Sequence, residues 1–234
     1  MVESLACSQL SWQPSLLDGE FDGGSAGAGD QPGSRPDADF TSLVRHRLDD
    51  CCWLDHAPGW LAGTDSLFEQ LLASGAFRQR ERWMYERMVD EPRLVAPWAL
   101  DHLPPAIDVA RRLLSHRYGV EFDSVLVNLY RDGRDSVAWH GDTVRKTQSH
   151  PMVVTISLGA RRRFLLRPRG GGTSARWLLG PGDLVVMGGR SQHDWEHCVP
   201  KMAVAGPRAS VTMRHSQSPA IPAPTARSAS DLRP

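Results

Sequence analysis

Residues 124–140, SVLVNLYRDGRDSVAWH, contain two short apolar runs, Ser124–Tyr130 and Ser136–His140, separated by Asp132-Gly133. This composition is typical of two β-strands joined by a turn. The pattern then repeats along the chain. The further runs are Met152–Leu158, Arg162–Arg167, Arg176–Leu179, Asp183–Met187, Trp195–Val199 and Arg208–Arg214. Short strands with frequent Gly, Pro and Asp turns predict a β-sandwich or jelly roll, with an open α+β sheet as the alternative.

Helices are predicted upstream of these strands. One begins near Thr64, and a second begins at Pro104-Pro105 and ends at Gly119. Between them, Arg78–Met88 mixes aromatic and charged residues and is interpreted as a strand. The fold class is therefore α+β, mainly β.

The composition limits the class of protein. The chain has 234 residues, of which 41% are hydrophobic, enough to bury a core. It contains no run of apolar residues long enough for a membrane span. Its first residues have neither a basic region nor a long apolar region, so we expect no secretion signal. Its four cysteines form neither a disulfide framework nor a CxxC zinc pattern. We expect a cytoplasmic, monomeric protein without membrane contact.

The charge is unevenly distributed although 27 basic residues balance 27 acidic ones. Residues 1–40 are acidic and Gly-rich and are predicted to form a disordered leader, and residues 217–234 a disordered Pro/Ala/Ser tail. The domain between them, residues 41–216, has a basic excess, and Thr143–Gly182 holds eight Lys and Arg without an acidic residue. Zero net charge therefore does not exclude a nucleic-acid partner.

Three residues form a candidate metal site. In His140-Gly141-Asp142, the imidazole and the carboxylate are two positions apart and share one face of an extended chain. With His197 in a second predicted strand they form the two-histidine, one-carboxylate set that holds Fe(II) and leaves positions open. His193 is the alternative third ligand, because residues four apart on a strand also share a face.

The last predicted strand offers an anion site. Arg208 and Arg214 are six positions apart and lie on one face of it. Their guanidinium groups could bind both carboxylates of a small diacid. Ser210 and Thr212 point the same way and can add hydroxyls.

These motifs together resemble the AlkB family of Fe(II)/2-oxoglutarate-dependent dioxygenases, which remove alkyl groups from nucleobases. The resemblance covers roughly residues 78–214 in order. The matching segments are Asn128-Leu129-Tyr130, His140-Gly141-Asp142, Ser157-Leu158-Gly159, Gly182-Asp183-Leu184, Met187-Gly188-Gly189, His197 and Arg208…Thr212…Arg214.

The resemblance implies a double-stranded β-helix, or jelly-roll, core with a nucleotide-recognition lid before it. It implies iron on His140, Asp142 and His197, which excludes His193. It also implies O2 as a co-substrate, and 2-oxoglutarate held by Asn128, Tyr130, Arg208 and Arg214. The implied reaction couples 2-oxoglutarate decarboxylation to methyl hydroxylation and aldehyde release from 1-methyladenine or 3-methylcytosine in DNA or RNA.

The substrate base would have to be single-stranded or flipped out of a duplex to reach such a site. Trp83, Tyr85 and Trp98 lie where the family builds its lid and are candidates for stacking on the base. Arg161 and Arg163, in the acid-free stretch, are candidates for phosphate contacts.

Two positions depart from the family pattern. Val144 stands two residues after Asp142, where several members have an acidic residue that contacts the base, and Ser210 replaces an Asn of the bacterial prototype. Two alternatives remain open, and Val144 supports the first of them. One is an oxygenase with a protein or small-molecule substrate, and the other is a non-catalytic jelly roll that binds nucleic acid.

Overall fold

The structure is a computed structural model that describes residues 33–74, 77–84, 86–142 and 148–216. Its strands are β1 (Arg35–Pro36), β2 (Val44–Arg47), β3 (Cys52–Ala57), β4 (Leu61–Ala62), β5 (Arg78–Met84), β6 (Arg87–Trp98), β7 (Ser124–Tyr130), β8 (Val137–His140), β9 (Val153–Gly159), β10 (Arg162–Pro168), β11 (Ala175–Leu179), β12 (Leu184–Gly189), β13 (Trp195–Val199) and β14 (Arg208–Arg214). Its helices are α1 (Thr64–Ala73), η2 (Leu100–His102), α2 (Pro105–Tyr118) and α3 (Ser191–Asp194).

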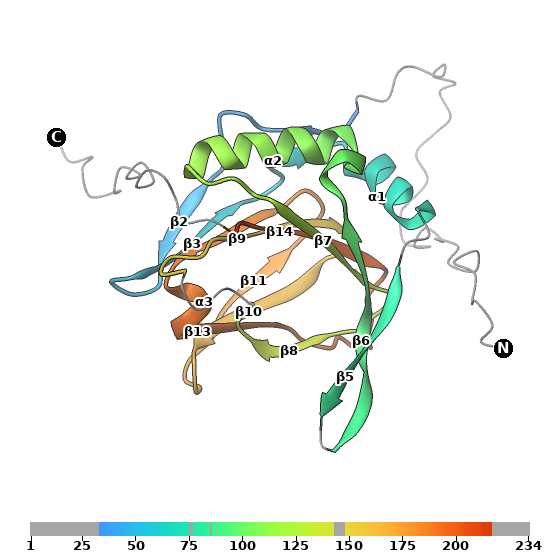
Figure 1. The fold of residues 1–234 in the computed structure, drawn as a ribbon, viewed down its shortest axis with the longest axis vertical. Coiled ribbons are helices and arrows are strands. Elements are labelled where there is room, and N and C mark those ends of the chain that lie inside the picture. The colour runs from blue at the N-terminus through green and yellow to red at the C-terminus, as the bar shows by residue number, and fades with distance from the viewer. Residues whose placement is uncertain (1–32, 75–76, 85, 143–147, 217–234) are drawn as a thin grey trace, which may run out of the picture.

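Two antiparallel sheets face each other (Figure 1). The larger has the order β2-β3-β12-β9-β14-β7-β6-β5, and the smaller has the order β11-β10-β13-β8. The chain crosses between them repeatedly from β7 to β14, which is the connectivity of a jelly roll. The predicted jelly-roll core is therefore confirmed, and each of the eight predicted strands is present within two residues of its expected bounds.

The larger sheet separates two apolar clusters. On one face, helices α1 and α2 cover it (Figure 1), and Val211 and Met213 of β14 pack into the cluster under them. On the other face, a smaller apolar cluster fills part of the space between the two sheets. Because side chains alternate along a strand, Arg208 and Arg214 point to this second side. The alternation of β14 thus places long polar side chains between the sheets.

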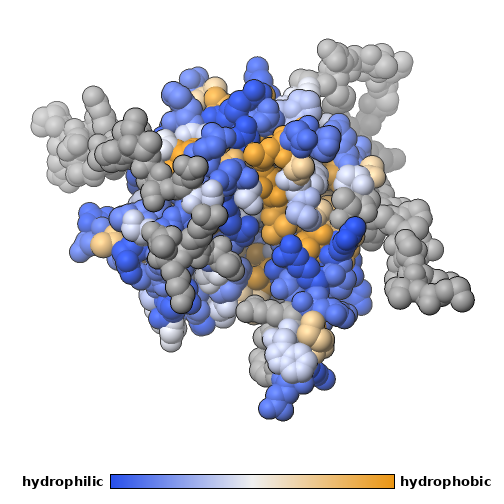
Figure 2. Space-filling model, viewed as in Figure 1, coloured by the Kyte–Doolittle hydropathy of each residue, from blue (hydrophilic) through white to orange (hydrophobic). Residues whose placement is uncertain are grey.

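The segment Arg78–Met88, predicted as one strand, is instead part of a hairpin formed by β5 and β6. The hairpin extends beyond the sheets (Figure 1). Near its end, Trp83 pairs with Met88, and these side chains are 66% and 52% exposed. Figure 2 shows pale and orange side chains beside blue ones at this end, and a further apolar surface in the middle of the same face of the molecule.

The described residues include regular structure before residue 41, the predicted start of the domain. β1 pairs with β4, and Trp60 donates a hydrogen bond from Nε1 to the carbonyl oxygen of Asp37 at 2.8 Å. Residues 1–32 and 217–234, predicted to be disordered, lie outside the described residues. Within the described residues, no helix is long and apolar enough to cross a membrane.

Candidate functional site

A cavity of about 470 Å³ opens between the two sheets. Every residue predicted to bind the metal or 2-oxoglutarate lines it, namely His140, Asp142, His197, Asn128, Tyr130, Arg208, Ser210, Thr212 and Arg214. The structure therefore brings both predicted sites into one space, although their residues come from strands of different sheets.

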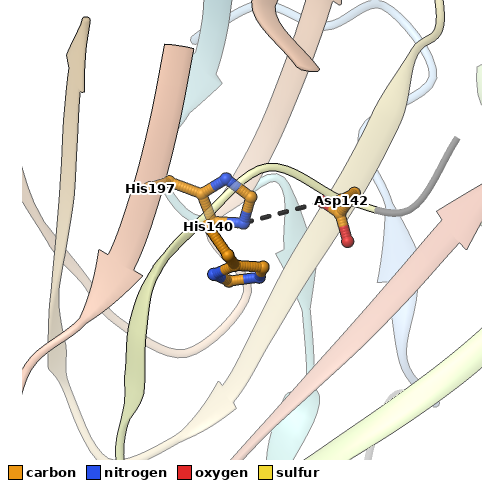
Figure 3. A group of neighbouring side chains, drawn as sticks. All are labelled: His140, Asp142 and His197. Atoms are coloured by element: carbon orange, nitrogen blue, oxygen red, sulfur yellow. Dashed lines mark ion pairs between the residues drawn. The ribbon is translucent and has the colours of Figure 1, made fainter. Parts of the chain in front are cut away.

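The two histidines are held opposite each other by strand pairing. His140 of β8 is the direct antiparallel partner of His197 of β13, and their ring centroids lie 4.3 Å apart. Asp142 follows β8, with Oδ2 3.6 Å from Nε2 of His197 (Figure 3). One ligand atom from each of the three side chains lies within 4.8 Å of the others. The spacing suits a single metal ion bound by all three.

The protonation states also suit a metal. Nδ1 of His140 lies 2.9 Å from the carbonyl oxygen of Ala138 and donates to it, so Nε2 is the nitrogen available as a metal ligand. Burial lowers the pKa of His197 to about 4, so this imidazole is neutral at neutral pH. Burial opposes ionisation of Asp142, but His197 and Arg214 hold the pKa of its carboxyl below the ordinary value. Two neutral imidazoles and one carboxylate are the ligands of non-haem Fe(II).

Neighbouring groups fix the position of Asp142. Its backbone N–H donates to Oε1 of the buried Gln192 at 2.9 Å, and its Oδ1 accepts a hydrogen bond from Nη2 of Arg214. A Cβ on Gly141 would lie 2.7 Å from the carbonyl oxygen of Gln192. The residue between His140 and Asp142 therefore needs to be glycine if the loop is to lie this close to α3.

Arg208 has the surroundings of an anion-binding residue. Its side chain is buried, and its Nη2 donates to Oγ of Ser157 at 2.7 Å. Nε and Nη1 are buried without a hydrogen-bond partner among the described residues, and Nε of Arg214 is in the same condition. Burial lowers the pKa of Arg208, and leaving buried charged donors unpaired is costly. A carboxylate ligand would satisfy these donors.

The hairpin supplies cavity residues that sequence reasoning missed. Arg80, Glu91 and Arg93 line the cavity from β5 and β6. Nε of Arg93 donates to Oδ1 of Asn128 at 3.0 Å, and Nη2 of Arg93 lies 3.1 Å from Oε2 of Glu91. The sequence held one signal for these residues, which is the alternation of side chains along β6. Glu91, Arg93 and Val95 lie on the same face of the strand, and Val95 pairs with Asn128 of β7.

The residues predicted to contact substrate are not brought together. Trp83 is exposed on the hairpin and lies outside the cavity lining. Trp98 pairs with Val125, packs against the core under the helices and lies outside the cavity lining, so its stacking on a base stays a prediction that this placement does not support. Tyr85 and Val144 lie outside the described residues. Local sequence could not show which face of the sheet Trp98 occupies.

The acid-free stretch is only partly a free basic surface. Arg162 is buried and donates to the carbonyl oxygens of Asp132, Asp135 and Pro200. Arg167 pairs with Glu196, and Arg169 donates to backbone carbonyls. Arg161 and Arg163 are exposed, as a phosphate contact requires, but they do not line the cavity.

His193 is absent from the cluster of candidate ligands. It lies in α3, and its Nε2 is 2.8 Å from the carbonyl oxygen of Gln148. Because a carbonyl oxygen only accepts hydrogen bonds, Nε2 carries a proton there and is not free to bind a metal. The geometry thus favours His197 over His193 as the partner of His140 and Asp142.

The comparisons with known proteins agree with this site. The model of the 2OG-Fe(II) oxygenase superfamily matches residues 61–218. The bovine (Bos taurus) alpha-ketoglutarate-dependent dioxygenase alkB homolog 3 is 32% identical over 62% of this chain and 59% of its own length. The DNA oxidative demethylase ALKBH2 of Arabidopsis thaliana is 29% identical over 50% of this chain and 45% of its own. The chain thus spans about half to three-fifths of the length of these relatives.

A solved structure supports the fold. The structure of OsALKBH1 superposes with a TM-score of 0.54 and 16% sequence identity, covering 74% of this chain and 100% of the other. This likeness concerns the fold alone. The family match spans more than half of the chain and includes all the cavity strands. The chain therefore belongs to the 2OG-Fe(II) oxygenase superfamily, and the relatives quoted above, to which it is similar, are AlkB homologues.

Proposed function

We propose that this chain is an Fe(II)- and 2-oxoglutarate-dependent dioxygenase that removes alkyl groups from N-alkylated bases of nucleic acids. The observation that carries the proposal is one cavity that holds both the cluster His140, Asp142 and His197 and the unpaired donors of Arg208 and Arg214. The similarity to relatives named as dioxygenases and DNA oxidative demethylases supports the nucleic-acid substrate.

In this proposal His140, Asp142 and His197 hold Fe(II). Phe164 stacks on His197, with ring centroids 5.4 Å apart, and keeps the imidazole facing the cavity. Gln192 orients Asp142 by accepting a hydrogen bond from its backbone N–H, and Arg214 orients it by donating to its carboxylate. A set of three protein ligands of this kind would leave positions on the metal for the 2-oxo acid and O2.

The 2-oxoglutarate would lie along β14. Arg208 would bind one carboxylate through its unpaired Nε and Nη1, while Arg214 and Asn128 would orient the opposite end. The amide of Asn128 is already fixed, because its Oδ1 accepts from Arg93 and its Nδ2 faces Ser210 at 3.5 Å. Tyr130, Ser210 and Thr212 would add hydroxyl contacts from the same wall.

Fe(II), 2-oxoglutarate and O2, when bound, would supply the oxidation: 2-oxoglutarate loses CO2, one oxygen atom enters the resulting succinate and the other hydroxylates the N-alkyl carbon. The hydroxylated group then leaves as an aldehyde and restores the base. The protein's part is to place the base beside the ligand cluster and to exclude water with apolar cavity residues such as Leu126, Val137 and Val199. A base inside a duplex cannot enter, so the substrate would be single-stranded or flipped. The active unit would be a monomer, because one chain supplies the whole cavity.

The test uses the full chain with Fe(II), 2-oxoglutarate and a single-stranded oligonucleotide carrying N1-methyladenine or N3-methylcytosine. We expect succinate and the unmethylated base in equal amounts, and neither product from Asp142→Ala. Glu81→Gln, which removes an exposed carboxylate of the hairpin, is the control and should retain activity. Succinate without demethylation would reject the nucleic-acid substrate in favour of a protein or small molecule. Oligonucleotide binding without either product would reject the enzyme.

A further inference from the structure

Glu91 places a carboxylate in the wall of the cavity. Its side chain is 18% exposed, and its Oε2 is buried without a hydrogen-bond partner among the described residues. Nη2 of Arg93 lies 3.1 Å from this oxygen but is not aligned for a hydrogen bond. Glu91 is therefore held in place by an ion pair and keeps an unused acceptor.

The position of Glu91 is at the boundary of two spaces. One is the cavity with the metal ligands, and the other is a groove of about 390 Å³ whose lining includes Val137, Trp139 and Pro200. Glu91 and His140 belong to the linings of both. A group bound where the two spaces meet would therefore lie near both the candidate metal ligand His140 and the Glu91 carboxylate.

Glu91 is also the carboxylate left for a substrate. Among the described residues that line the cavity, Asp142 and Glu91 carry the only carboxylates. Asp142 is already engaged by Arg214 and His197. Arg93, which holds Glu91, is itself fixed by its hydrogen bond to Asn128. The carboxylate of Glu91 is thus anchored to the wall that would hold the co-substrate.

We propose that Glu91 is a specificity-determining residue, which accepts a hydrogen bond from the exocyclic amino group of a cationic alkylated base. The inference rests on the proposed function and specifies which class of alkylated base the same site would prefer. Alkylation of adenine at N1 or of cytosine at N3 leaves a positive charge and amino N–H donors, both of which a carboxylate attracts. N3-methylthymine is neutral and presents a carbonyl oxygen in place of the amino group, which a carboxylate repels.

The test separates binding from turnover. The full chain is loaded with Mn(II) and 2-oxoglutarate without O2, and its affinity is measured for single-stranded oligonucleotides that carry N3-methylcytosine, N3-methylthymine or unmodified cytosine. We expect the wild type to bind the N3-methylcytosine oligonucleotide most tightly. Glu91→Gln should weaken that binding by roughly 10-fold, as the loss of one charged hydrogen bond implies. Binding of N3-methylthymine should stay equal or improve, because an amide can donate to its carbonyl oxygen.

Two comparisons make the result decisive. Glu81→Gln removes the same charge from an exposed site on the same hairpin and should keep the wild-type preference. Thermal unfolding of Glu91→Gln should match that of the wild type, since the exchange keeps the side chain's shape. If Glu91→Gln retains the preference for N3-methylcytosine, or the wild type has none, the proposal is overturned. If the preference depends on Glu91 but no base is demethylated with Fe(II) and O2, the proposed function fails while this inference stands.

Discussion

His140 and His197 are direct partners in the pairing of β8 with β13, with ring centroids 4.3 Å apart. The ladder of the smaller sheet therefore sets the separation of the two imidazoles. Asp142 is placed beside them by the short Gly141 connection and by Gln192. Because strand pairing holds both imidazoles and the tight connection holds Asp142, we expect a metal site that is formed before the metal arrives.

Asp142→Ala should lower the affinity for Co(II) or Mn(II) by roughly 100-fold or more, because it removes the charged ligand itself. His193→Ala is the matched comparison and should leave the affinity within about twofold, since Nε2 of His193 faces the carbonyl oxygen of Gln148. Titration followed by Co(II) absorption measures both variants. If His193→Ala bound metal much more weakly than the wild type, His193 would have to be a metal ligand after all.

Gln192 should act on the metal through Asp142. Gln192→Leu leaves the N–H of Asp142 without its acceptor, and we expect metal affinity to fall by roughly 10-fold. Gln192→Glu keeps an oxygen at this place and should recover most of the affinity. The same Co(II) titration checks the pair, with circular dichroism to compare their folds. Equal affinities for both variants would show that the hydrogen bond does not position Asp142.

Arg208→Ala should raise the KM for 2-oxoglutarate by roughly 10-fold to 100-fold, which corresponds to the binding free energy lost with one charged hydrogen-bonding group. Its buried Nε and Nη1 lack a hydrogen-bond partner among the described residues and could bind a carboxylate of 2-oxoglutarate. Metal affinity should be unchanged, because Arg208 does not contact the ligand cluster. Arg163→Ala removes an exposed arginine and should leave the KM for 2-oxoglutarate as it was. Succinate formation against 2-oxoglutarate concentration gives both values.

The sequence predicts the strands and the candidate ligands because both depend on short-range patterns. Period-two alternation marks β14 and puts Arg208 and Arg214 on one face, and the same rule links His140 with Asp142. Sequence reasoning misses the β5–β6 hairpin because its alternating charges give no apolar face to detect. Alternation along β6 groups Glu91 with Arg93, but the pairing of β6 with β7, a long-range contact, decides that this face lines the cavity.

Asp183 should make stability depend on pH. Its carboxylate accepts from the N–H groups of Gly59 and Gly180 at 2.8 Å each, and His56 lies 3.8 Å away. Burial opposes ionisation, but His56 and the two N–H groups hold the pKa of Asp183 below its ordinary value. A carboxyl with a lower pKa when folded adds stability above the unfolded pKa of about 3.9, and this stability is lost as the pH falls through the folded pKa.

Asp183→Asn should therefore lower the free energy of unfolding by about 1–3 kcal/mol at pH 7, through weaker hydrogen bonds to the same donors. The difference from the wild type should persist to about pH 4 and shrink below it. Urea unfolding at pH 7, 5 and 3 measures it. Asp101→Asn, at a carboxylate that is 77% exposed, should change little at any pH. A difference for Asp183→Asn that stayed constant down to pH 3 would contradict the ionic origin.

The two described tryptophans of the lid segment should behave in opposite ways. Trp98 packs against the core under the helices, so Trp98→Ala should lower the free energy of unfolding by about 3 kcal/mol. Trp83 is 66% exposed, so Trp83→Ala should change that free energy by less than about 0.5 kcal/mol. If Trp83 stacks on an unpaired base, its loss should weaken oligonucleotide binding by roughly 10-fold.

Urea unfolding and oligonucleotide affinity, measured on both variants, separate packing from stacking. Trp98→Phe keeps an aromatic ring in the core and should recover most of the stability lost in Trp98→Ala, with unchanged affinity. Trp83→Phe keeps a ring at the exposed site and should recover most of the affinity. Reduced affinity in a fully stable Trp98→Ala would show that Trp98 reaches the substrate, against its placement on the helix side of the sheet.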